Sequence, residues 1–226
     1  MGKPGQVKNV PTKRAEDVRT RHVHVPRVLA VYGSPRSGGN TDTLLDYFLD
    51  GCRQAACRVE KAVLRELDIL PCSSCNRCGQ TGMCVIDDDM TRYYDALVGY
   101  ERIVFAFPVF FMGPPAVAKA FIDRGQALWV RRFVLKRMTV SDGRKGFLLS
   151  TGGFCSPDHR PGERIFSCNI SITKAFMSAC GVRYSGELLY PGIEGADDVR
   201  KSYGIMRDAI KAGRKWIGPE GHSNLK

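Results

Sequence analysis

Four cysteines that lie close together in this chain have the spacing of metal ligands. They are Cys72, Cys75, Cys78 and Cys84, in the pattern CxxCxxCxxxxxC. Two successive CxxC steps can place three thiolates around one metal cluster. Gly79 and Gly82 allow the chain to turn back, so that the last cysteine supplies a fourth thiolate. Four thiolates match a 4Fe-4S cluster, so this segment predicts redox chemistry.

Two alternatives for the cysteine array stay open. Structural zinc sites more often use two CxxC pairs separated by a longer loop, so the overlapping spacing favours iron–sulfur over zinc. The thiols could also carry no metal. The chain has nine cysteines, and an odd number argues against a closed disulfide framework. The other five are expected to be small buried residues: Cys52, Cys57, Cys155, Cys168 and Cys180.

The segment GSPRSGGNT, from Gly33 to Thr41, has the small and polar residues of a phosphate-binding turn. It lies between an apolar strand and a helix, where backbone N–H groups can converge on a phosphate. Gly39 and Asn40 stand where a Walker loop needs Lys and then Ser or Thr, and the segment does not have the GxGxxG pattern of dinucleotide sites. We therefore predict a site for one terminal phosphate, with an ordinary glycine-rich turn as the alternative. Its candidate residues are Ser34, Arg36, Asn40 and Thr41.

Two further segments follow predicted strands and have the composition of a binding site. PVFFMGPP, from Pro108 to Pro115, offers apolar and aromatic side chains on a proline-stiffened backbone, which could wall a flat ring. In TGGFC, the residues from Thr151 to Gly153 let the backbone approach a ligand closely. Taken singly, the first segment could also be a loop packed on the core, and the second a tight turn.

Alternating strands and helices are predicted to position these segments. Short apolar runs predict strands at 27–33, 58–64, 102–107, 146–151 and 182–190. Helices are predicted over 44–56, 88–98, from about 115, over 163–179 and over 199–217. Asp87, Asp88 and Asp89 are expected to start the second helix, where the helix dipole favours carboxylates. Parallel strands need crossover helices on both faces, so the pattern predicts a doubly wound five-stranded parallel sheet of the α/β class.

Each candidate segment follows a different predicted strand. The glycine-rich segment follows the first strand, the cysteine array the second, PVFFMGPP the third and TGG the fourth. In a doubly wound sheet, ligands bind beyond the carboxyl ends of the strands, where the strand order reverses. We therefore expect the four segments at one edge of the sheet.

The composition fits a globular protein and excludes several classes. With 226 residues, 43% of them hydrophobic and 25% charged, the chain is neither disordered throughout nor in need of a metal to hold its fold. The longest stretch without a charge, 103–118, is too short and too rich in proline for a membrane helix. Residues 1–27 lack the apolar core of a secretory signal, so we expect a cytoplasmic protein. HExxH and GxSxG motifs are absent, and hydrolase chemistry is unsupported.

The formal net charge of +11 is concentrated in two places. Residues 1–26 show neither strand nor helix periodicity and are predicted to form a basic extended arm ahead of one domain at 27–226. A second basic cluster lies at 131–145. Basic patches suit polyanionic partners, so a nucleic-acid-binding protein is kept as a less favoured rival hypothesis.

Together these motifs resemble the iron–sulfur flavoprotein branch of the NADPH-dependent FMN reductase family. The similarity runs from Arg27 to the end of the last helix. It rests on GSPRSGGNT, the cysteine array with CVIDDDM, FPVFFMGPPAVAKAFIDR, STGG and GVRYSGELLYPGI. It implies a flavodoxin-like fold with strand order 2-1-3-4-5 and a 4Fe-4S cluster on the four cysteines of the 72–84 loop. The arm before Arg27 lies outside the resemblance.

The resemblance also implies an FMN site. The phosphate would be held by Ser34, Arg36, Ser37, Gly39, Asn40 and Thr41. The ribityl chain and the isoalloxazine would be surrounded by Pro108, Val109, Phe110, Phe111, Met112 and Gly113 with Thr151, Gly152 and Gly153. The implied strand order places the cysteine loop and the phosphate loop at one edge, so we expect the cluster to lie near the flavin.

The implied function is an oxidoreductase that passes electrons between a reduced donor, either ferredoxin or NAD(P)H, and a small or protein acceptor. A homodimer or homotetramer is implied as well, in which the cluster of one subunit faces the flavin of another. The alternative is a cluster-free NAD(P)H-dependent FMN or quinone reductase, as in the wider family. No nicotinamide-specific motif is visible, so NAD(P)H rests on the resemblance alone.

Overall fold

The computed structural model describes residues 25–140, 143–153 and 165–218. The five strands in these ranges form one parallel sheet in the order β2-β1-β3-β4-β5. The strands are β1 (Arg27–Tyr32), β2 (Arg58–Val63), β3 (Arg102–Ala106), β4 (Lys145–Thr151) and β5 (Arg183–Tyr190). All four strand pairs are parallel, so the carboxyl ends lie at one edge, as the pairing of Tyr32 with both Val63 and Ala106 illustrates. The predicted fold class and strand order are confirmed.

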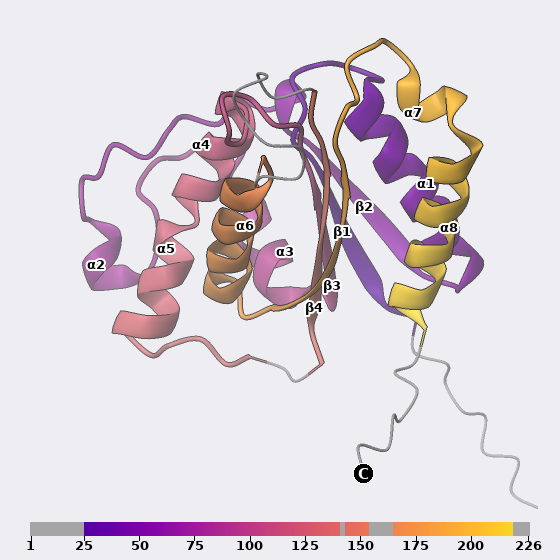
Figure 1. The fold of residues 1–226 in the computed structure, drawn as a ribbon. Coiled ribbons are helices and arrows are strands. Elements are labelled where there is room, and N and C mark those ends of the chain that lie inside the picture. The colour runs from indigo at the N-terminus through magenta and orange to yellow at the C-terminus, as the bar shows by residue number, and fades with distance from the viewer. Residues whose placement is uncertain (1–24, 141–142, 154–164, 219–226) are drawn as a thin grey trace, which may run out of the picture.

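Helices cover both faces of the sheet (Figure 1). One face carries α1 (Asn40–Gln54), the short α7 (Asp198–Lys201) and α8 (Tyr203–Ile217). The other face carries α3 (Tyr93–Gly99), α4 (Ala116–Arg124), α5 (Gln126–Trp129), the π-helical turn η2 (Val130–Val134) and α6 (Ser167–Ala179). A 3-10 turn, η1 (Leu64–Glu66), follows β2, and the single-turn α2 (Cys78–Thr81) lies beside α5, away from α1 and α8.

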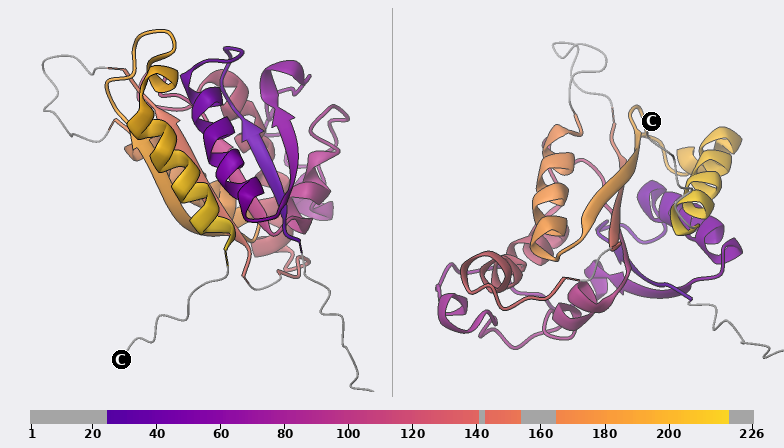
Figure 2. Two further views of the ribbon diagram at one scale, coloured as in Figure 1. Left: turned by 90° about the vertical axis from the view of Figure 1, so that its right-hand side faces the viewer. Right: turned by 90° about the horizontal axis from the view of Figure 1, so that it is seen from below.

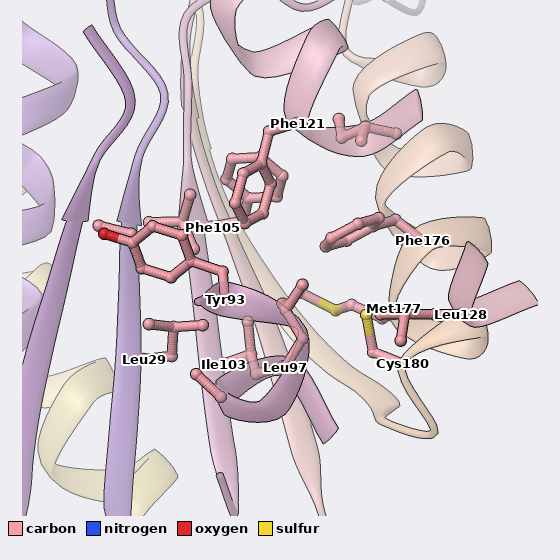
Figure 3. Packing of buried hydrophobic residues seen from close by; sticks show 14 of the residues in the cluster. Leu29, Tyr93, Leu97, Ile103, Phe105, Phe121, Leu128, Phe176, Met177 and Cys180 are labelled. Carbon is pink, nitrogen blue, oxygen red and sulfur yellow. The ribbon is translucent and has the colours of Figure 1, made fainter. Parts of the chain in front are cut away.

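The sheet separates two hydrophobic clusters because side chains alternate between the faces of a strand. On β1, Leu29 and Val31 belong to the cluster beneath α3 to α6, whereas Val28 and Ala30 belong to the cluster beneath α1 and α8. Figure 3 shows the first cluster, in which aromatic rings from β3, α4 and α6 meet edge to face or tilted. Burial of these apolar faces stabilises the scaffold that holds the loops at the carboxyl edge.

Helices α1 and α8 pack unusually closely, side by side (Figure 2). A Cβ atom added to Gly51 would lie 1.9 Å from Ile210 O, and one added to Gly213 would lie 1.9 Å from Phe48 O. No side chain fits at either position without moving a backbone. The two glycines therefore set the distance between the helices.

Two predicted helices differ from the observed ones. The helix expected over 88–98 begins only at Tyr93, because residues 88–92 form turns in which Asp88 and Asp89 bind backbone N–H groups of the segment after β2. The helix expected over 199–217 breaks at Ser202, whose Oγ accepts a hydrogen bond from Ile205 N and starts α8. Tyr203, expected on its buried face, is 71% exposed.

Residues 1–24 of the predicted basic arm lie outside the described residues, so the extended form of the arm stays a prediction. Within the described ranges, no helix has the length and apolar character needed to cross a membrane.

Candidate functional site

The glycine-rich segment forms a turn between β1 and α1 at the carboxyl edge. Gly33 N donates to Ala106 O at 2.7 Å, and a Cβ at Gly33 would meet Phe107 Cβ at 3.0 Å, so this close approach favours glycine. Gly39 is the N-cap of α1 and supplies no side-chain cap, and the first helical hydrogen bond runs from Thr43 N to Gly39 O. The N–H groups of the first turn are therefore left for an anion, at the positive end of the helix dipole.

A buried carboxylate, Asp42, organises this turn from within α1. It is 4% exposed and accepts hydrogen bonds from Gly38 N (3.1 Å) and Arg65 Nη1 (2.9 Å) through Oδ2. Arg65 comes from η1, after β2, and also reaches Arg36 O and Ser37 Oγ, each at 3.5 Å. Burial raises the pKa of Asp42, and the Arg65 charge opposes that shift. The sequence interpretation missed both residues, which stand 23 positions apart with no motif joining them.

The predicted phosphate residues play different parts in the turn. Ser34 is buried, and its Oγ accepts from Arg36 N at 3.1 Å, while Arg36 and Ser37 are exposed. The side chain of Asn40 faces another loop, since Nδ2 donates to Gly195 O at 2.8 Å and Oδ1 accepts from Val199 N at 3.0 Å. Asn40 therefore ties α1 to α7 and to the segment before it, and its side-chain amide is already engaged.

Thr41 joins the phosphate turn to the end of β4. Its Oγ1 lies 2.7 Å from Thr151 Oγ1, and both side chains are buried. Thr151 O accepts from Val109 N at 2.9 Å, and a Cβ on Gly152 would lie 3.3 Å from Val109 Cγ2. The structure thus brings together the segments 33–41, 108–113 and 151–153, as expected for loops at the carboxyl ends of β1, β3 and β4. Gly153 lies by Glu194, whose Cγ would be 3.1 Å from an added Cβ.

The segment after β3 ends in a tight hairpin turn. Phe110 N donates to Gly113 O at 2.8 Å, and Gly113 N donates back to Phe110 O at 2.9 Å. The two residues between them, Phe111 and Met112, have φ values of +47° and +63°. Both positive angles are typical of a type I′ turn, which usually takes Asn or Gly because L side chains are strained there.

The strained turn presents apolar side chains to solvent. Phe111 is fully exposed, and Phe110 and Met112 are about 40% exposed (42% and 39%). Backbone strain is often found at binding sites, and exposed apolar patches often mark them as well. Pro108 and Val109 are half-buried behind the turn. The hairpin therefore fits the predicted wall of a flat ring.

All four cysteines of the array line a single cavity of about 270 Å³. Cys72 and Cys75 are exposed, Cys78 and Cys84 are half-buried, and none of them forms a disulfide. Positive φ angles at Ser74, Asn76 and Gly82 wind the chain around the cavity. Among the described residues, no three His, Cys, Asp or Glu side chains stand close enough to hold a metal ion without moving. The four thiols match a 4Fe-4S cluster in kind and number, and the loop must move for them to ligate one.

The thiols already influence one another. Burial raises the pKa of the Cys78 thiol, and the charges of Cys84, Cys72 and Cys75 raise it further. The Cys75 thiol has a lowered pKa, because a backbone N–H at Arg77 stabilises its thiolate. These charge effects agree with the four thiols lining one cavity.

A buried ion pair holds the two stems of the cysteine loop. Arg124, at the end of α4, donates to Leu70 O (2.9 Å) and Ile86 O (3.1 Å), and it pairs with Asp88. Burial alone would raise the pKa of Asp88, but the Arg124 guanidinium and the N–H groups of Leu70 and Met90 hold it below its ordinary value. The expectation that Asp88 serves a helix start through the dipole is wrong. Asp88 instead closes a loop by pairing with an arginine 36 residues away.

None of the residues that line the cysteine cavity belongs to the phosphate turn or to the hairpin turn, although we expected the cluster to lie near the predicted flavin site. The cavity is lined by Asp123, Arg124, Gln126 and Ala127, at the end of α4 that points away from the hairpin turn. Helix α4 has nine residues and therefore spans about 13 Å. It is η1 with Arg65, not the cysteines, that borders the phosphate turn. The array begins nine residues after β2, which is enough chain to carry it across to α5 (Figure 1).

The remaining cysteines divide into two groups. Cys52 and Cys180 are buried and Cys57 is half-buried, as expected for small core residues. Cys168 is exposed, which contradicts the expectation. It stands in the first turn of α6, with Sγ 3.6 Å from where a Cβ on Gly113 would lie. Cys155 lies outside the described residues.

Comparison with known proteins gives this geometry a family context. Residues 26–156 match the model of the family described as NADPH-dependent FMN reductase. An iron-sulfur flavoprotein of Methanosarcina thermophila is 30% identical over 127 residues, which are 56% of this chain and 63% of that protein. An iron-sulfur flavoprotein of Methanocaldococcus jannaschii is 31% identical over 102 residues, 45% of this chain and 53% of that protein. The matched stretch thus covers less than two thirds of either relative.

A solved structure extends the likeness of fold along most of the chain. The NAD(P)H:quinone oxidoreductase from Methanothermobacter marburgensis superposes with a TM-score of 0.63, covering 88% of this chain and 100% of that one. The sequences are 16% identical, so this likeness supports the flavodoxin-like fold alone.

Proposed function

Because the chain belongs to the NADPH-dependent FMN reductase family, we propose that the protein is an oxidoreductase that binds FMN and a 4Fe-4S cluster. It passes electrons from a reduced donor, ferredoxin or NAD(P)H, to a small or protein acceptor. When bound, FMN exchanges electron pairs or single electrons and the cluster exchanges single electrons, so together they connect two kinds of carrier.

The proposed FMN site uses the three loops at the carboxyl edge. The phosphate lies against the first turn of α1, where uncapped N–H groups and the helix dipole favour an anion. Arg65 offsets the charge of Asp42, so the turn can accept a phosphate next to a buried carboxylate. The full set of proposed phosphate residues is Ser34, Arg36, Ser37, Gly39, Asn40 and Thr41, with Asn40 acting through its backbone.

The hairpin turn orients the ring of the flavin. Phe110, Phe111 and Met112 offer apolar surface that is otherwise exposed to water, and beside them Gly152 packs against Val109 and Gly153 against Glu194. Covering that surface excludes water from one side of the ring. Pro108, Val109, Gly113 and Thr151 complete the proposed wall.

The proposed cluster site consists of Cys72, Cys75, Cys78 and Cys84. Support comes from the shared cavity, the free thiols, and the relatives named iron-sulfur flavoproteins. Arg124 and Arg131 hold the loop in place, the second by donating from Nε to Gly82 O at 3.1 Å.

The main support for the FMN site is the position of Thr151. Its hydrogen bonds with Thr41 and Val109 bring three loops together, one suited to a phosphate and the others to a flat ring. Protein purified without oxygen should show flavin absorption together with a broad iron–sulfur absorption. Chemical analysis should find iron and acid-labile sulfide in a four-to-four ratio. Protein with stoichiometric zinc and no sulfide would eliminate the cluster, and failure to bind added FMN would eliminate the flavin site.

The alternative is a cluster-free NAD(P)H-dependent FMN or quinone reductase. It is favoured by the spacing of the described cysteines, no three of which are within reach of one metal ion. Replacing Cys72 and Cys78 with Ser distinguishes the two. Unchanged NAD(P)H oxidation in that variant favours the alternative, whereas loss of electron transfer with retained FMN favours the cluster enzyme.

A homodimer or homotetramer is part of the proposal. The cysteine cavity is about one length of α4 from the hairpin turn of its own chain, and in the proposed assembly the cluster faces the flavin of a second subunit. Analytical ultracentrifugation tests this, and a monomer at micromolar concentration would contradict it. The cytoplasmic location and the basic arm stay predictions.

A further inference from the structure

Arg124 has the largest fully buried side chain among the described residues, and it lies in the wall of the cysteine cavity. Its side chain is 0% exposed, and that of its partner Asp88 is 4% exposed. A buried guanidinium is costly unless every N–H group has a partner. The hydrogen-bond partners of Arg124 therefore show what the residue is for.

Four of its five N–H groups are used to close the cysteine loop. Nη1 donates to Leu70 O and to Asp88 Oδ2, and Nη2 donates to Ile86 O and to Asp88 Oδ1. Leu70 stands two residues before Cys72, and Ile86 stands two residues after Cys84. Asp88 Oδ2 also accepts from Leu70 N at 2.9 Å, so the two stems are tied to each other through this ion pair.

The fifth donor, Nε–H, is buried and has no hydrogen-bond partner in the described part of the chain. Arg124 shares the lining of the cavity with the four cysteines and the loop between them. Sulfur atoms of an iron–sulfur cluster accept hydrogen bonds, and such bonds raise the reduction potential by stabilising the added negative charge.

We propose that Arg124 is a positioning residue for the cluster, which closes the cysteine loop with its terminal N–H groups and donates Nε–H to a cluster sulfur. This inference rests on the proposed function, since it needs a cluster in the cavity. It adds a residue from α4 that sets how readily the cluster accepts one electron.

Arg131 provides a matched control on the same loop. It reaches the loop from η2, and its Nε already donates to Gly82 O at 3.1 Å. Arg124→Lys and Arg131→Lys each keep the positive charge and each remove an anchor of the cysteine loop. Only Arg124→Lys removes an N–H group that is free to meet a sulfur.

The first experiment is a titration of the cluster with dithionite, followed by electron paramagnetic resonance, on the full chain with its cofactors. Each cluster takes up one electron from the reductant. Arg124→Lys should lower the equilibrium constant for reduction by about tenfold, which corresponds to about 59 mV. Arg131→Lys should leave it within about threefold. An equal effect of the two variants, or no effect of Arg124→Lys, would overturn the inference.

A second measurement needs no variant that could misfold. Wild-type protein labelled with 15N-arginine should show one arginine nitrogen coupled to the reduced cluster in pulsed electron paramagnetic resonance, and Arg131→Lys should retain that coupling. A cluster without any arginine coupling overturns the inference and leaves the proposed function intact. Wild-type protein without iron and sulfide overturns the proposed function itself.

Discussion

Thr41 Oγ1 and Thr151 Oγ1 lie 2.7 Å apart in the interior, and this hydrogen bond joins the first turn of α1 to the end of β4. The contact spans 110 residues of sequence. It holds the phosphate turn against the loop that would flank the ring, so it couples the two halves of the proposed FMN site.

Thr151→Val tests this coupling. Valine has nearly the same shape but leaves the Thr41 hydroxyl buried without a partner, so we expect a loss of about 1–3 kcal/mol in the free energy of unfolding. FMN should bind more weakly as well. Urea denaturation and fluorescence titration with FMN measure the two effects. The double variant Thr41→Val/Thr151→Val should recover part of the lost stability, and strictly additive losses would argue against the hydrogen bond.

The Arg124–Asp88 pair predicts acid sensitivity of the fold. The pKa of Asp88 is held below its ordinary value in the folded state, so the pair contributes stability at and above the unfolded pKa of about 4. That contribution is lost as the pH falls through the lower, folded pKa. Urea denaturation of the cofactor-free protein between pH 6 and pH 3 should show it, and Asp88→Asn should flatten the profile.

Arg124→Met tests the same pair at neutral pH. It leaves the Asp88 carboxylate buried and without its counter-charge, so we expect a loss of about 3–5 kcal/mol. Arg92→Met is the control, because Arg92 pairs with Asp89 at the surface, where such a pair is worth about 0–1 kcal/mol. Similar losses in the two variants would contradict a special role for the buried pair.

Gly213→Ala should destabilise the protein by about 3 kcal/mol, because its Cβ would collide with the backbone of α1 at Phe48 O. Gly204→Ala is the matched control in the same helix. Its nearest neighbour would be Ser202 Oγ at 3.9 Å, so this substitution should be neutral or stabilise by up to about 1 kcal/mol. Thermal unfolding distinguishes them, and a harmless Gly213→Ala would contradict the close helix packing.

Phe111→Asn should stabilise the protein and weaken FMN binding. The side chain is fully exposed, so no packing is lost, and Asn tolerates positive φ better than Phe by roughly 0.5–1 kcal/mol. Phe133→Asn removes another exposed aromatic group from a backbone with no positive φ, so it should bring no gain in stability and leave FMN affinity unchanged. Equal FMN affinity in wild type and Phe111→Asn would remove the hairpin turn from the proposed site.

The order of strands and helices was largely predictable from the chain itself. Hydrophobic periodicity is a local property, and β1, β3 and the glycine turn that follows β1 could each be identified from a short run of residues. Parallel strands then bring their carboxyl ends to one edge, which is why three of the predicted segments meet around Thr151.

The sequence by itself thus determined the sheet, the candidate loops and the set of cysteines. Only the tertiary structure decided which side chains pair across them. Arg65 reaches Asp42, Arg124 reaches Asp88, and Asn40 turns from the phosphate turn toward Gly195, over separations of 23, 36 and 155 residues. Such pairs depend on how packed helices orient buried charges, and no local pattern of residues encodes that orientation. For the same reason the cysteine cavity lies against α5 and not beside the phosphate turn, although β2 ends next to β1.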